Sequence, residues 1–201
     1  EHHYGENEGL LKLSLFHRWV DDVEELVPLN LDDSQPGNLP DGRRWGAQVE
    51  FGLRLERFGM SGAVINGSYK WQDSETVDPF TGETRQFDGD ERYEASLEFR
   101  HDLERFRGAY GMSWSAEGRE YGFDVDRTDI EKSGNGLRMF VERRIGQSLI
   151  MRLSASQLHE PSYRRFRYNY VPDRATGVID SLETRTSTSS RTASLSLNGI
   201  F

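Results

Sequence analysis

Apolar and polar residues alternate with a period of two along most of this chain. The clearest stretch is WGAQVEFGLRLERF, residues 45–58. One parity holds the apolar side chains and the other holds mainly polar ones: Trp45, Ala47, Val49, Phe51, Leu53 and Leu55 against Gln48, Glu50, Gly52, Arg54 and Glu56. A helix has a period of 3.6 and would mix these sets, whereas successive side chains of a strand point to opposite faces. The stretch therefore predicts a strand with one apolar face.

Seven further stretches show the same alternation, which gives about eight strands in all. They cover residues 10–19, 62–71, 91–102, 108–118, 136–146, 148–157 and 192–201. The apolar residues have odd numbers in most of them. In 108–118 they have even numbers, because the preceding turn shifts the parity. The chain is thus predicted to be an all-β, antiparallel, up-and-down sheet.

The predicted connections alternate between short and long. Short links occur at ERFGM, HDLERFRG and RRIGQS, and long ones span residues 21–43, 74–91, 118–135 and 159–183. The long links carry turn-forming residues, as in SQPGNLPDG and DPFTGE. Short periplasmic turns and long extracellular loops are typical of an outer-membrane β-barrel. We therefore expect residues 1–201 to be a transmembrane barrel segment.

The polar faces carry charges of both signs, which we expect to line the barrel lumen and to pair across strands. These residues are Glu50, Arg54, Glu56, Glu94, Glu98, Arg100, Arg138, Glu142, Arg144 and Arg152. Aromatic residues near strand ends are expected to form girdles at the membrane interfaces. They are Trp45, Phe58, Tyr69, Trp71, Tyr93 and Trp114.

The amino-acid composition excludes some kinds of protein but does not identify one. The 201 residues contain no cysteine, which excludes a disulfide scaffold and a cysteine-bound metal. A net charge of −9 argues against nucleic acid as a partner. No stretch approaches the roughly 20 apolar residues of a transmembrane helix. The chain begins EHHYGENEGLL, without a signal-peptide pattern, so we expect a signal that was removed or a start that is not the natural one.

The sequence shows no constellation of catalytic residues, and we expect no enzyme activity, no cofactor and no metal. The five histidines form no HExxH pair, and no GxSxG elbow occurs. The acidic stretches DVDRTD and FDGDE lack the glycine and glutamate positions of a calcium loop, so we expect solvated loops. The stretch YRRFRYNY is expected to extend a hairpin above the membrane, where Arg164 and Arg165 would meet lipopolysaccharide phosphates.

Several stretches together resemble the C-terminal part of the barrel of TonB-dependent outer-membrane receptors. They are YGENEGLLKLSLFHRWVDDVEELV, DPFTGETRQF, YEASLEFRHDL, GAYGMSW and GLRMFVERRIGQSLIMRLSASQLHEPSYRRFRYNY, and they span nearly the whole chain. The resemblance implies a place in the outer membrane of a Gram-negative bacterium. It also implies energised import of a scarce solute, such as a ferric siderophore, a cobalamin or a glycan.

The last stretch, ASLSLNGIF, resembles the terminal strand that the barrel-assembly machinery reads. The residues that match this signal are Leu195, Leu197, Gly199 and Phe201, with Gly199 smaller than the pattern often has. Nothing matches the plug of the family or the segment that engages the energy transducer. About eight strands also fall short of the roughly 22 of such a transporter. The resemblance therefore implies a fragment, a cropped domain or a truncated gene product.

Two other readings stay open. One is a complete small outer-membrane barrel with a structural or adhesion role, although glycines and serines fill a narrow interior poorly. The other is a soluble β-sandwich binding module, which would bury its apolar face against a second sheet.

Overall fold

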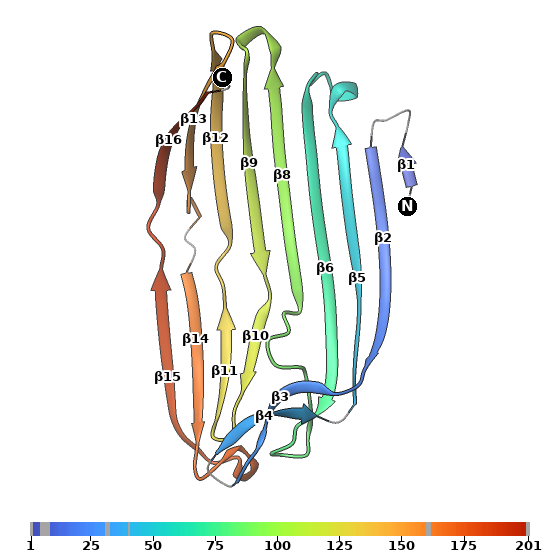
Figure 1. Cartoon of the computed structure of the whole chain (residues 1–201), viewed down its shortest axis with the longest axis vertical. Coiled ribbons are helices and arrows are strands. Elements are labelled where there is room, and N and C mark those ends of the chain that lie inside the picture. Colours follow the sequence, from blue (N-terminus) through green and yellow to red (C-terminus); the bar gives the residue numbers. More distant parts are fainter. Residues whose placement is uncertain (1, 5–8, 31–32, 40, 160–161, 200–201) are drawn as a thin grey trace.

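The computed structural model describes residues 2–4, 9–30, 33–39, 41–159 and 162–199, and these form antiparallel sheets with three short 3-10 helices. The main sheet has the order β1-β2-β5-β6-β8-β9-β12-β13-β16 (Figure 1), and β7 pairs with the far end of β6. Its strands are β1 His2–Tyr4, β2 Gly9–Val20, β5 Gly42–Arg54, β6 Ala63–Val77, β7 Thr84–Arg85, β8 Tyr93–Leu103, β9 Gly108–Glu117, β12 Gly136–Ile145, β13 Leu149–Ser156 and β16 Thr192–Gly199.

The eight strands expected from the alternation are confirmed as β2, β5, β6, β8, β9, β12, β13 and β16. From β2 onward each main strand lies beside the next in the chain, so the sheet is up-and-down. One boundary was wrong, because Glu56 and Phe58 lie in the 3-10 helix η1 Glu56–Phe58. The strand ends earlier because Gly59, with φ 78°, closes a tight turn in which the Leu55 amide donates to the Ala63 carbonyl.

A second sheet, in the order β10-β11-β14-β15, extends the main one end to end (Figure 1). Its strands are β10 Arg119–Phe123, β11 Arg127–Lys132, β14 Ser162–Tyr170 and β15 Ile179–Thr188. The expectation of loops at 118–135 and 159–183 was therefore wrong for most of these residues. The hairpin expected at YRRFRYNY is confirmed, since β14 pairs with β15. The long link 21–43 also forms a hairpin, β3 Val23–Pro28 with β4 Ser34–Leu39.

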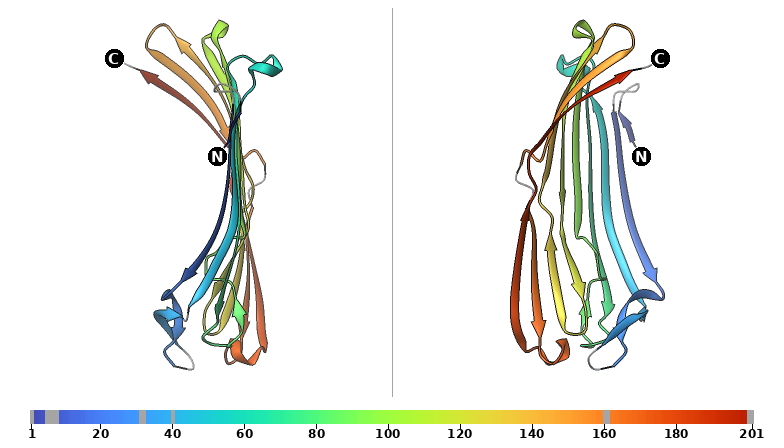
Figure 2. Two further views of the ribbon diagram at one scale, coloured as in Figure 1. Left: turned by 90° about the vertical axis from the view of Figure 1, so that its right-hand side faces the viewer. Right: turned by 60° about the vertical axis from the view of Figure 1, so that its left-hand side comes forward.

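Strand register places the apolar side chains on one face of the main sheet, because directly paired residues share a face. One row across six strands reads Leu11, Phe51, Gly67, Leu97, Trp114 and Leu137. The shift to even numbers in β9 is confirmed by this pairing. The face is open: Leu15 is 77% exposed and Trp19 is 78% exposed. Figure 2 shows the main sheet as a twisted single layer.

The main sheet is open at both edges. Among the described strands, no pairing joins β1 or β2 to β15 or β16. The all-β antiparallel fold is thus shown, and barrel closure is not part of it. No helix in the described ranges is long and apolar enough to cross a membrane.

Candidate functional site

The polar face of the main sheet brings together nine of the ten charged residues expected there, the exception being Glu56 in η1. Several of them pair across strands, as expected. The pairs are Lys12–Glu50 at 3.2 Å, Lys70–Glu94 at 2.7 Å, Arg100–Glu142 at 2.6 Å and Arg152–Glu142 at 3.6 Å. These pairs are largely exposed, so each stabilises the fold by about 0–1 kcal/mol.

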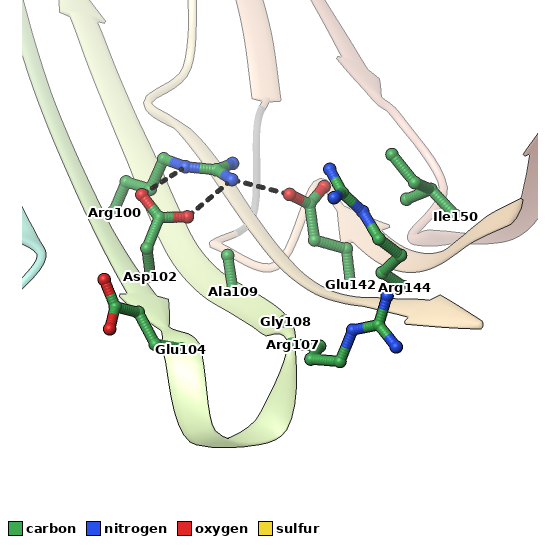
Figure 3. Close-up of a pocket in the computed structure, with 9 residues that line it drawn as sticks. All are labelled: Arg100, Asp102, Glu104, Arg107, Gly108, Ala109, Glu142, Arg144 and Ile150. Carbon is green, nitrogen blue, oxygen red and sulfur yellow. Dashed lines mark hydrogen bonds and ion pairs between the residues drawn. The ribbon is translucent and has the colours of Figure 1, made fainter. Parts of the chain in front are cut away.

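The densest part of this face lies near the short turns, where a depression of about 330 Å³ is lined by both acids and bases (Figure 3). The Arg100 guanidinium bridges Asp102 at 2.8 Å and Glu142 at 2.6 Å. The Arg152 guanidinium lies 3.9 Å from the Phe140 ring centre, a cation–π distance. Arg144 also lines the depression. The result is a hydrated surface of mixed charge, with no single sign that would select an ionic ligand.

The remaining three predicted charges lie on the same face, away from these pairs. Glu98 and Arg138 line a second depression of about 360 Å³, on either side of Ser113. Arg54 lies at the end of β5, opposite Val64.

A different cluster lies at the long-loop end, and sequence reasoning missed it. Its centre is Asp78, whose side chain is 1% exposed. The carboxylate accepts hydrogen bonds from Arg85 Nε at 2.6 Å and from Arg174 Nη1 at 2.8 Å. It also accepts from the backbone amides of Phe80 at 2.8 Å and Thr81 at 3.0 Å. A buried carboxylate is tolerated only with such partners.

The two arginines extend the cluster to other segments. Arg85 Nη2 donates to Glu25 of β3 at 2.8 Å, and Arg174 Nε donates to the backbone carbonyl of Asp124. The Arg85 and Arg174 guanidinium groups lie 4.3 and 5.3 Å from the Phe123 ring centre. The network therefore joins the β3–β4 hairpin, the link after β6, the β10–β11 turn and the β14–β15 link.

Electrostatics at Asp78 combine opposing effects. Burial by itself raises the pKa of this carboxyl, and the hydrogen bonds and charges of Arg174 and Arg85 lower it; the net shift is downward. Asp78 is therefore ionised at neutral pH. The cluster went unseen because its members lie far apart in the chain, and DPFTGE carries only a turn signal.

A cavity of about 610 Å³ adjoins this cluster. Its lining includes Asp78, Arg85, Arg174, Phe123, Tyr170 and Glu83, together with threonines from three segments. Its size falls in the usual range for small-ligand sites, about 300–1,000 Å³.

Three of the six acidic residues in the stretches expected to be solvated loops form ion pairs. Asp90 pairs with Arg44 at 2.6 Å, and Asp124 pairs with Arg127 at 2.9 Å. Asp129 forms a bidentate pair with Arg167, both distances being 2.7 Å. Arg167 and burial act in opposite directions on the pKa of Asp129, and the net shift is downward. Within the described ranges, no group of three or more histidine, cysteine, aspartate or glutamate side chains is placed to hold a metal ion.

The expected assembly signal lies on the last strand of the main sheet. Leu195 and Leu197 of β16 are 63% and 61% exposed. Gly199 pairs with Leu149, and Phe201 lies outside the described residues.

Comparison of this chain with protein-family models, with curated proteins and with solved structures found no match.

Proposed function

We propose that this chain is a wall segment of an outer-membrane β-barrel of the TonB-dependent receptor type, which imports a scarce solute. The observation that carries the proposal is the exposed apolar face of the main sheet, opposite a face of paired charges. The receptor type and the import role rest on the sequence resemblance alone. In this role the chain contacts lipid on one face and water on the other. Another part of the receptor supplies the plug and the segment that engages the energy transducer, which is a separate partner.

The height of the apolar band fits a bilayer. On β8 it runs from Tyr93 to Leu103, 11 residues. Ten steps of about 3.4 Å give about 34 Å along the strand. At a tilt of about 45° this spans about 24 Å, close to the apolar band of about 25 Å in outer-membrane barrels.

The band gives way to charged residues over two rows at the long-loop end. Trp71 is paired with Tyr93 in one row, and in the next row Trp45 is already opposite Asp73. One row further, Arg43 and Glu75 face each other and form an exposed ion pair at 2.8 Å. Aromatic residues followed by charge are what a membrane interface favours.

Charge continues on the second sheet, at positions of the same parity as the apolar residues below. Odd-numbered residues of β12 and β13 are apolar except Arg143, at the short-turn end, and the odd-numbered residues Asp129, Arg167 and Glu183 form one paired row in β11, β14 and β15. A change from mainly apolar residues in the main sheet to charged ones in the second sheet fits a barrel that rises from lipid into water.

Each alternative meets an obstacle. A complete small barrel requires its first and last strands to pair, and the described strands leave both edges open. A sandwich requires a covering layer, and Leu13, Leu15 and Leu195 are more than half exposed.

The first test is extraction of the native protein. We expect it to stay with outer membranes through washing in carbonate or in urea, and to leave only with detergent. Release without detergent would overturn the proposal and favour a sandwich. The intact mass of the polypeptide that ends in TASLSLNGIF tests the receptor type: we expect a mass well above that of 201 residues.

Lipopolysaccharide contact is a further expectation of this proposal. Arg164 and Arg165 cannot act together, since neighbouring residues of β14 point to opposite faces. Arg165 lies between Glu131 of β11 and Arg185 of β15, and it has the parity that is mainly apolar in β12 and β13. Glu131 offsets one of these two arginines, which leaves one positive charge for a phosphate. Arg164 lies on the other face, between Lys132 and Thr186. We expect Arg165→Ala and Arg185→Ala to weaken lipopolysaccharide binding several-fold in a vesicle-binding assay. Equal loss in Arg164→Ala would contradict this assignment.

A further inference from the structure

The cavity beside the Asp78 cluster contains an unmet hydrogen-bond donor. Arg174 lines the cavity, and its side chain is 6% exposed. Its Nε donates to the Asp124 carbonyl and its Nη1 to Asp78. Its Nη2 is the one buried side-chain nitrogen or oxygen in the described ranges that has no partner. A buried donor without an acceptor is costly, so the Nη2 group calls for a partner from outside the chain, such as a ligand or a water.

The charges around the cavity identify the kind of acceptor. Asp78 pairs with Arg85 and Arg174, Glu25 pairs with Arg85, and Glu83 lines the cavity, so the carboxylates outnumber the guanidinium groups. Arg85 is fully engaged, with Asp78, Glu25 and the Gln86 carbonyl as its partners. No positive charge is left over to hold an anion. A neutral ligand that both donates and accepts hydrogen bonds suits this balance.

The other lining groups suit the same ligand. Thr81, Thr84, Thr128 and Tyr170 line the cavity, and a hydroxyl group can both donate and accept a hydrogen bond. Glu83 is exposed at the cavity and forms no ion pair within the described ranges. Sugar hydroxyls match alternating donors and acceptors of this kind.

We propose that this cavity binds a short neutral oligosaccharide, with Arg174 Nη2 donating to a sugar oxygen and Glu83 accepting from a sugar hydroxyl. This inference rests on the proposed function in one respect: it names the class of solute that the receptor would import. Since Nη2 is now covered, the adjoining turn η3 Arg174–Thr176 must shift to admit the sugar oxygen. Asp173, which caps this turn through the Thr176 amide, and Gly177, at φ 68°, flank the part that moves.

Calorimetric titration of the full-length protein in detergent tests the inference, with maltotriose, xylotriose and chitotriose as neutral probes and with citrate and phosphate as anions. We expect at least one trisaccharide to bind and neither anion to bind. Arg174→Lys keeps the positive charge beside Asp78 but removes Nη2. We expect it to weaken binding about tenfold or more. Because a buried substitution can disturb folding, Glu83→Gln at the exposed rim provides a second variant with the same expected direction, and Glu183→Gln on β15 provides a control.

Binding of the anions alone, binding of no trisaccharide, or unchanged affinity in both Arg174→Lys and Glu83→Gln would overturn the inference. The carbonate or urea wash distinguishes failure of this inference from failure of the proposed function. A protein that stays in the membrane but binds no trisaccharide would refute only the inference. A protein that washes off the membrane and still binds the sugar through Arg174 would refute only the proposed function.

Discussion

Met112→Arg is expected to block assembly into the outer membrane, whereas Ser113→Arg is expected to assemble normally. Met112 lies near the middle of the apolar band, paired with Phe99 and Met139, and it is 37% exposed. An arginine on the lipid face near the bilayer midplane costs about 2–4 kcal/mol. The readout is the fraction of protein in the outer membrane, together with its unfolding free energy in lipid vesicles.

Ser113→Arg is the matched control for Met112→Arg. Ser113 belongs to the same strand but faces the polar side, between Glu98 and Arg138, and it lines a depression with room for a longer side chain. The same chemical change one residue away therefore leaves the lipid face intact. Equal damage by both variants would mean that the apolar face does not contact lipid.

Asp78→Asn is expected to open the loop cluster. The variant leaves the buried Arg85 and Arg174 without their shared carboxylate, and removing one partner of a buried ion pair costs about 3–5 kcal/mol. Hydrogen exchange of backbone amides in residues 78–85 and 170–178 should accelerate accordingly. As a matched control, Asp102→Asn breaks the exposed pair with Arg100 and should change local stability by about 0–1 kcal/mol.

The same carboxylate makes the cluster sensitive to acid. The pKa of Asp78 is lower in the folded protein than the ordinary value of about 3.9. Its contribution to stability is therefore complete above that ordinary value and is lost as the pH falls below it, through the folded-state pKa. We expect exchange in residues 78–85 to be constant from pH 7 to about pH 5, after correction for intrinsic rates. A steep rise only below about pH 4 should follow. Loss of protection already near pH 6 would contradict this account.

The sequence predicts the main sheet well because the signal is local. A strand exposed to different surroundings on its two faces must alternate, so Leu11, Leu13 and Leu15 define a strand without knowledge of their partners. Register follows, since a one-residue slip would reverse every side chain. The failure at Glu56 is also local: alternation continues through ERF, but the tight turn at Gly59 ends the ladder.

Most of the second sheet and the loop cluster were missed for a different physical reason. In β14 charged and aromatic residues share each face, Tyr163 with Arg165 and Arg164 with Phe166, so the contrast between faces is weak. The partners of Asp78 are fixed by where the links fold back, and no spacing in the sequence records this. The ion pair of Asp129, in the stretch DVDRTD, is with Arg167, a residue 38 positions away that no local pattern identifies.

The loop cluster also has a consequence for the order of folding. From β2 onward each main strand pairs with the next main strand in the chain, so the main sheet can form hairpin by hairpin. Asp78 and Arg174, in contrast, are separated by almost half the chain, and Glu25 joins their cluster through Arg85. Contacts of such high sequence separation form late. The β3–β4 hairpin should thus gain its protection in step with the β14–β15 link, although the hairpin is made much earlier in the chain.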